Sequence, residues 1–111
     1  MAKRVNLGIP GVRLNETGHR VLAAIASRAR AATGLACEPV QVRVRELSRE
    51  ARVSWSTCVR TAHSLEGYGL ITSEERIGED GGTLPNAYAL TALGLECLRI
   101  ADELAAADGQ E

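Results

Sequence analysis

The sequence is poor in aromatic side chains. It contains no Phe, one Trp and two Tyr, although 45% of its 111 residues are hydrophobic. The core must therefore be built mainly from Leu, Ile, Val and Ala. A chain of this length is expected to form one small domain around one modest core.

Long apolar runs are also missing. No run approaches the roughly 20 residues that a membrane-spanning helix needs, and the basic start of the chain lacks the apolar segment of a secretory signal. The three cysteines, Cys37, Cys58 and Cys97, are far apart and form no CxxC pair, which favours reduced thiols in a cytosol. We therefore expect a cytoplasmic protein with no membrane partner. Its Arg- and Ala-rich composition is typical of GC-rich bacterial coding.

Motifs for catalysis are missing as well. The segment "GEDGG" lacks the Lys-Ser/Thr of a phosphate-binding loop and does not directly precede a helix. No nucleophile–base pair is evident, so we expect no enzyme and no cofactor. Cys58 and Cys97 fall in apolar stripes and are interpreted as core residues. A metal or effector sensor is a third class of function, but the nearest candidate zinc ligands, Cys58 and His63, do not stand at close ligand spacing.

The net charge of −1 conceals a strong asymmetry. Residues 1–60 hold 11 of the 13 basic and 4 of the 14 acidic residues, a balance of +7, and the remaining residues have a balance of −8. A basic half is what a protein needs to bind a polyanion. The alternative is that the arginines are scattered over solvated helix faces, and the pI of about 6.1 is low for a nucleic-acid binder.

Sequence patterns predict three segments: an N-terminal arm over 1–14, one domain over 15–107 and a frayed tail over 108–111. Gly8, Pro10 and Gly11 should break any regular element in the arm. Within the domain, the predicted elements in chain order are a helix over 15–33, a strand over 40–44, helices over 45–52 and 54–67, strands over 70–77 and 87–90, and a helix over 91–107. The fold class is therefore α+β with the order α-β-α-α-β-β-α.

The two central helices have the pattern of a helix-turn-helix. Their apolar residues converge on one interior, with Ser54 as the natural cap of the second helix; these are Leu47, Ala51, Val53, Cys58, Ala62 and Leu65. At about 100° per residue, the opposite face of the second helix is short and polar and carries one charge, Arg60. Such a face can enter a DNA major groove without repelling phosphates.

The segment "LSREARVSWSTCVRTAHSLEGYGLI", residues 47–71, resembles the winged helix-turn-helix of small bacterial, phage and plasmid regulators. "NAYALTALG", residues 86–94, is similar to the return strand of the wing in these proteins. MarR-like, PadR-like and plasmid replication-type winged helices share the pattern. The resemblance implies that residues 54–64 form the recognition helix. The DNA contacts that it implies are Ser54, Trp55, Ser56, Thr57, Arg60 and Thr61.

Arg60 is the foremost of these candidates, because a guanidinium can bind a phosphate or a guanine with two hydrogen bonds. Its alternative role is a surface ion pair with Glu50 or another acidic residue. Trp55 lies on the flank of the helix and has packing against the scaffold as its alternative. The basic residues expected to contact phosphates are Arg45, Arg49, Arg52 and, in the arm, Arg4.

The predicted wing departs from this family because it is acidic. It carries Glu74, Glu75, Glu79 and Asp80 against a single base, Arg76. Wings that enter a minor groove usually bring Arg or Lys. Either this wing stays off the DNA, or the domain is a protein–protein interaction module that does not bind DNA.

Two further expectations concern the turn and the last helix. Arg52 stands where such turns often carry glycine, and we interpret it as a phosphate clamp rather than a plain exposed arginine. The last helix has two apolar stripes, and the stripe of Leu95, Leu98, Ala101 and Ala105 is predicted to form a homodimer interface. The alternative is a monomer with one wide buried face.

The leading hypothesis is a dimeric, nucleoid-associated transcriptional regulator or plasmid/phage control protein that binds double-stranded DNA. A chain of this size leaves little room for a small-molecule pocket.

Overall fold

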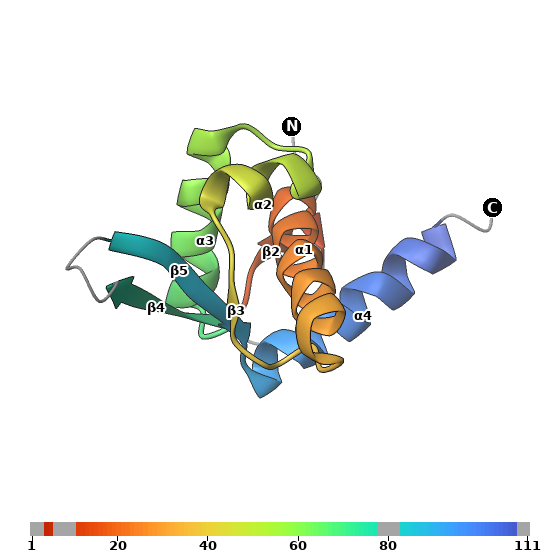
Figure 1. The fold of residues 1–111 in the computed structure, drawn as a ribbon. Coiled ribbons are helices and arrows are strands. Elements are labelled where there is room, and N and C mark those ends of the chain that lie inside the picture. The colour runs from red at the N-terminus through yellow and green to blue at the C-terminus, as the bar shows by residue number, and fades with distance from the viewer. Residues whose placement is uncertain (1–3, 6–10, 78–82, 109–111) are drawn as a thin grey trace.

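The computed structural model describes residues 4–5, 11–77 and 83–108. Its elements in chain order are β1 (Arg4–Val5), β2 (Leu14–Asn15), α1 (Glu16–Thr33), β3 (Val40–Gln41), α2 (Val44–Ala51), α3 (Trp55–Gly67), β4 (Ile71–Ile77), β5 (Thr83–Leu90) and α4 (Ala92–Asp108). Helices α1, α2 and α3 gather in one body, the β4–β5 hairpin extends from one side, and α4 leaves from the other (Figure 1). This confirms the predicted α+β order, with β1 and β2 added. None of the helices in the described ranges is both long enough and apolar enough to span a bilayer.

Helix α1 is the centre of the packing, and its predicted ends are confirmed. The Asn15 side chain accepts a hydrogen bond from the Gly18 backbone N–H at 2.7 Å, so it caps the first turn. Gly34, at φ 84°, adopts the left-handed conformation that ends the helix, and its N–H donates to the Arg30 carbonyl. The buried side of α1, with Leu22 and Ile25 fully enclosed, contacts α2, α3, α4 and β5.

The three-stranded sheet has the antiparallel order β3-β5-β4. Strand β3 is shorter than the predicted 40–44, because the chain already enters a helix: Arg43 is the residue before α2, and its carbonyl accepts from the Leu47 N–H. Val42 still packs in the core, while Val44 belongs to α2. Strand β5 begins at Thr83 instead of residue 87, so the hairpin is longer than predicted.

The N-terminal segment contains a strand pair that the sequence did not suggest. Arg4–Val5 pairs antiparallel with Leu14–Asn15, so the prediction that no regular element precedes the first helix was wrong. The Leu14 side chain, 2% exposed, lies in the core and holds the second strand of the pair in place. Gly11, at φ 80°, allows the chain to return between the two strands.

Two of the cysteines belong to the core, as predicted. Cys58 and Cys97 are fully buried, and burial raises the pKa of both thiols. Both thiols are therefore protonated near neutral pH and are poor metal ligands, since a metal binds the thiolate. Tyr88 is the one aromatic residue among the buried core residues of the described chain.

The position of α4 corrects the predicted dimer interface. Leu98 and Ala101 are 2% and 1% exposed in the single chain, so both pack in the chain's own core and cannot form a partner-facing stripe. Gly94 and Cys97 complete this buried face, and only Leu95 and Ala105 of the predicted stripe remain exposed. The exposed apolar edge of α4 consists instead of Leu93 and Leu104, with half-buried Ile100 between them; Leu95 is exposed on the opposite flank.

Candidate nucleic-acid interface

The turn between α2 and α3 is left-handed at Arg52, which has φ 60° and ψ 45°. Two backbone hydrogen bonds define it: the Val53 N–H donates to the Ser48 carbonyl at 3.0 Å, and the Arg52 N–H donates to the Arg49 carbonyl at 3.2 Å. This is the Schellman arrangement, in which the left-handed residue is most often glycine. Arg52 is the one non-glycine residue with positive φ in the described chain.

The end of α3 repeats this geometry with glycine in place of arginine. The Leu70 N–H donates to the Leu65 carbonyl at 2.9 Å, and the Gly69 N–H donates to the Glu66 carbonyl at 3.0 Å. Gly69 has φ 76°. Arg52 therefore holds the position that Gly69 holds one helix later, although a side chain in this conformation costs on the order of 1–2 kcal/mol. The exposed Arg52 side chain lies in the turn that leads directly into α3.

Helix α3 exposes the face predicted for DNA. Cys58, Ala62 and Leu65 are buried, whereas Ser56 and Arg60 are exposed. Trp55 is 60% exposed, so most of its side chain is accessible to a ligand.

The hydroxyls at the start of α3 are partly engaged in capping. Ser54 Oγ accepts from the Thr57 N–H at 3.2 Å and donates to Thr57 Oγ1 at 2.8 Å. Thr57 and Thr61 are half-buried. Of the six predicted contacts on this helix, Trp55, Ser56 and Arg60 are therefore the most available to a ligand in the groove.

Arg28 of α1 pairs with both carboxylates on the acidic side of α2. Its Nε donates to Glu50 Oε2 at 2.8 Å, and its Nη1 lies 3.4 Å from Glu46 Oε2. The hydrogen bond to Glu50 raises the pKa of the Arg28 guanidinium further. The predicted alternative for Arg60, a pair with Glu50 or another acid, is not found among the described residues, where the Glu50 carboxylate pairs with Arg28.

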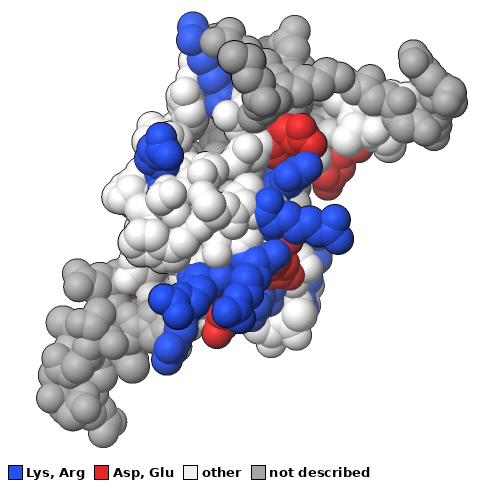
Figure 2. All heavy atoms as spheres, turned by 90° about the horizontal axis from the view of Figure 1, so that it is seen from above, with Lys and Arg blue, Asp and Glu red and all other residues white. Residues whose placement is uncertain are grey.

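The remaining arginines of this region form a set that we call the cationic face. Within the described residues none of them makes an ion pair; they are Arg43, Arg45, Arg49, Arg52 and Arg60. All five are exposed. Figure 2, seen from the side on which α2 and the start of α3 lie, shows several groups of Lys and Arg side chains there, with smaller acidic patches beside some of them. The cationic face therefore places positive charge along α2, in the turn before α3 and in the second turn of α3.

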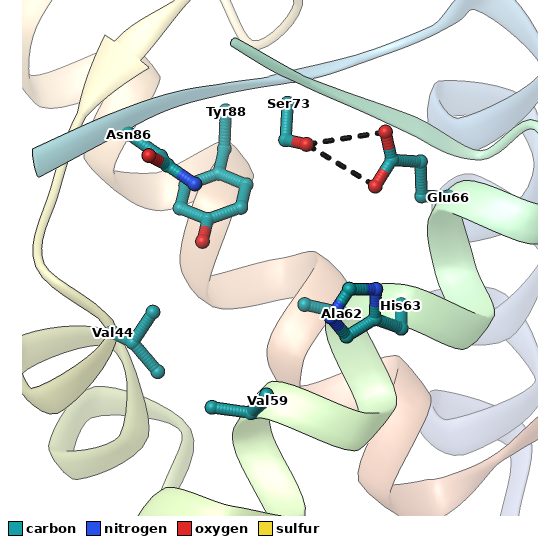
Figure 3. A pocket seen from close by; sticks show the side chains of 8 residues that line it. All are labelled: Val44, Val59, Ala62, His63, Glu66, Ser73, Asn86 and Tyr88. Atoms are coloured by element: carbon teal, nitrogen blue, oxygen red, sulfur yellow. Dashed lines mark hydrogen bonds between the residues drawn. The ribbon is translucent and has the colours of Figure 1, made fainter. Parts of the chain in front are cut away.

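A side-chain hydrogen bond joins the last turn of α3 to β4, the first strand of the wing. The Ser73 hydroxyl lies 3.1 Å from both carboxylate oxygens of Glu66 (Figure 3). Beside this contact is a small hollow of about 70 Å³; the side chains around it are Val44, Val59, Ala62, His63, Glu66, Ser73, Asn86 and Tyr88. Enclosing a drug-sized ligand takes about 300 Å³ or more. The hollow is too small for such a ligand.

The other predicted wing and arm residues are only partly described. Glu74 is exposed on β4. Arg4 lies in β1, and Glu75 and Arg76 lie in β4, but their side chains are outside the described part of the chain. The tip residues Glu79 and Asp80 are outside the described residues as well. Across the described residues, no three or more His, Cys, Asp or Glu side chains are grouped to hold a metal ion.

Comparison with solved structures places this geometry in a known fold. A MarR-family transcriptional regulator from Silicibacter pomeroyi superposes with a TM-score of 0.60 and 20% identity over 94% of this chain and 57% of that one. Staphylococcus aureus MarR, in complex with salicylate and kanamycin, gives 0.57 and 20% over 84% and 53%. A mutant of S. aureus MepR, bound to an oligodeoxyribonucleotide, gives 0.56 and 15% over 86% and 59%. The chain has the MarR-type winged-helix fold.

The MarR-type fold confirms the resemblance stated from residues 47–71. The chain spans a little over half the length of these MarR-type structures. No protein-family model matches the sequence, and no curated protein matches it.

The sequence did not indicate a role for Arg28. Its partners Glu46 and Glu50 lie 18 and 22 residues further along the chain, on another helix, and a pairing over this separation leaves no local pattern.

Proposed function

We propose that this protein is a sequence-specific double-stranded DNA-binding regulator, of transcription or of a plasmid or phage, which reads the major groove with α3. The observation that carries the proposal is the combination of an exposed polar helix face with the cationic face around its start. The first MarR-type neighbour is a transcriptional regulator, and the MepR mutant is bound to an oligodeoxyribonucleotide, which supports the same reading for this chain.

The roles follow from side-chain chemistry and position. Arg60, in the second turn of α3 on the groove-facing side, would read a base edge or bind a phosphate with two hydrogen bonds. Arg45, Arg49 and Arg52 would bind phosphates and position α3 in the groove. Ser56 and Trp55 would lie beside the bases at the start of the helix, where a hydroxyl can donate and an indole can contact a thymine methyl.

A homodimer is part of the proposal. The exposed edge of Leu93, Ile100 and Leu104 continues the buried face of α4, and a second copy would remove these apolar side chains from water. Two copies of α3 about 34 Å apart, one turn of DNA, would then read a two-fold symmetric site. We expect such a protein in the cytoplasm, on the nucleoid.

The salt dependence of binding tests the DNA proposal. Because binding phosphates releases counterions, the Kd for a duplex should rise by about a thousandfold between about 50 and 200 mM salt for a dimer with six or more phosphate contacts. Fluorescence anisotropy with labelled duplexes from genomic upstream regions measures it. If neither these nor mixed-sequence duplexes bind at low salt, the proposal fails.

Two substitutions separate base reading from phosphate binding. Arg60→Ala should reduce the preference for the selected site by about 1–3 kcal/mol, because a specific contact is lost. Arg49→Ala should weaken binding to every duplex to a similar extent and lower the salt slope by about one. Arg99→Ala on α4, far in sequence from α3, is the control and should change neither.

The acidic wing favours one alternative, a protein–protein interaction module. Glu74 is exposed on β4, and a carboxylate next to DNA phosphates is unfavourable. A pull-down that retains a protein partner and no nucleic acid would support this alternative over DNA binding.

A further inference from the structure

One ion-pair network crosses from the scaffold to the first helix of the helix-turn-helix. Arg28, from the middle of α1, reaches both Glu46 and Glu50, which stand one turn apart on α2. The Arg28 side chain is 38% exposed, and the side chains of Glu46 and Glu50 are 47% and 34% exposed. The network therefore lies at the surface, where its charges act on whatever approaches α2.

The positions of the charged residues on α2 divide the helix into two stripes. Glu46 and Glu50 are four residues apart and share one stripe; Arg45 and Arg49 are four apart and share another, about 100° around the helix. The buried residues Leu47, Ser48 and Ala51 occupy the remaining side. The acidic stripe faces Arg28, and the basic stripe belongs to the cationic face.

Without Arg28, the acidic stripe would compete for the cationic face. Glu46 stands three residues before Arg49, a spacing at which opposite charges pair on a helix. A carboxylate paired with Arg49 would lower the positive potential of α2 and would have to be displaced before a phosphate could bind. Arg28 holds both carboxylates on the α1 side, away from this competition.

We propose that Arg28 is a positioning residue for polyanion binding: it sequesters Glu46 and Glu50 so that Arg45 and Arg49 are free to bind phosphates. This inference builds on the proposed DNA-binding function and adds a residue outside the helix-turn-helix to it. Arg28 itself need not touch the DNA.

Charge-removal variants test the proposal with a mixed-sequence DNA duplex at low ionic strength. Arg28→Gln should raise the Kd about three- to tenfold, because two uncompensated carboxylates remain on α2. The double variant, with Glu46→Gln and Glu50→Gln, keeps Arg28 and should change the Kd by no more than about twofold, because Arg28 already holds both carboxylates away from the cationic face. The triple variant, with Arg28→Gln, Glu46→Gln and Glu50→Gln, should also stay within about twofold of the wild type, because the carboxylates that Arg28 holds are gone.

The triple variant separates the proposed role from two others. If Arg28 contacted DNA directly, or if it only braced α1 against α2, Arg28→Gln would weaken binding as much in the Glu46→Gln, Glu50→Gln background as it does in the wild type. A triple variant that binds about three- to tenfold more weakly than this double variant therefore overturns the proposal. Thermal melts of each variant show whether it is folded.

Arg99 on α4 is a matched control. It also pairs with two carboxylates, those of Glu96 and Glu103, so Arg99→Gln makes the same change in net charge. Its effect on the Kd should stay within about twofold; an effect as large as that of Arg28→Gln overturns the proposal, because net charge alone would then explain both. A wild type that binds no duplex overturns the DNA-binding function and this inference together, whereas a binding wild type with an unchanged Arg28→Gln overturns this inference alone.

Discussion

At Gly94, helix α4 lies against the start of the wing without room for a side chain. A Cβ added there would lie 1.8 Å from the Leu70 carbonyl oxygen and 2.8 Å from its carbonyl carbon. Backbone atoms cannot move aside as the end of a flexible side chain can. The close approach of α4 to Leu70, the residue before β4, therefore depends on glycine at this position.

We predict that Gly94→Ala lowers the free energy of unfolding by about 3 kcal/mol or more, because the clash must be relieved by moving one element. Gly67, in α3, is the control: a Cβ there meets nothing within 4 Å, so Gly67→Ala should stabilise the protein by about 0.5–1 kcal/mol. Urea unfolding of both variants measures the difference. Equal stability of Gly94→Ala and the wild type would contradict the described contact.

Arg52 gives a second prediction at this scale. Arg52→Gly should leave stability unchanged or raise it by up to about 1 kcal/mol, because glycine adopts the left-handed conformation without a steric cost. The same change should weaken DNA binding about three- to tenfold if the guanidinium binds a phosphate. Arg52→Lys keeps the charge and should retain most of the affinity. Unchanged binding by a folded Arg52→Gly would reject the phosphate clamp.

At the scale of elements, Thr91 joins β5, α4 and the start of β4. Its Oγ1 donates to the Gly69 carbonyl at 2.6 Å and accepts from the Gly94 N–H at 3.0 Å, while its own N–H donates to the Leu70 carbonyl at 3.0 Å. Thr91→Val keeps the shape and removes the hydroxyl, so it should cost about 1–2 kcal/mol of stability. Thr91→Ser should recover most of that loss in the same denaturation experiment.

The ends of the helices could be predicted from the sequence because their signals are local. Asn15, Ser54 and Thr91 each accept a backbone N–H within three residues, and such caps can be read from residue type and spacing. The extent of β3 and β5 could not be predicted this way, because strand pairing between Val40 and Tyr88 is decided by distant parts of the chain.

The exposure of the candidate interface was predictable to the same degree. The exposed face of α3 follows from helical periodicity, so Ser56 and Arg60 are exposed as predicted. The buried face of α4 was not predictable, since both of its stripes are apolar and only packing against the rest of the fold distinguishes them. The pairing of Arg28 is a tertiary contact and has no local signature.

At the scale of the whole molecule, the proposed dimer predicts different outcomes for two leucines of α4. Leu104, 41% exposed, lies on the proposed interface, so Leu104→Glu should give folded monomers in sedimentation. Leu98, 2% exposed, lies in the core, so Leu98→Glu should unfold the chain, because a carboxylate cannot be buried there without a partner. A wild type that sediments only as a monomer at micromolar concentration would contradict the dimer.

The length of α4 beyond the body has a consequence for the DNA site. Its last fully buried residue is Ala101, next to the contact between His19 Nε2 and Asp102 Oδ1 at 2.7 Å, and residues 102–107 are exposed as the helix leaves the body (Figure 1). In the proposed dimer, moving the crossing point of the two helices by one turn would shift the subunits by about 5.4 Å, more than the roughly 3.4 Å between base pairs. The position at which the two α4 helices cross would thus set the spacing of the two DNA half-sites. The number of base pairs between the half-sites would in turn reveal where along α4 the two chains meet.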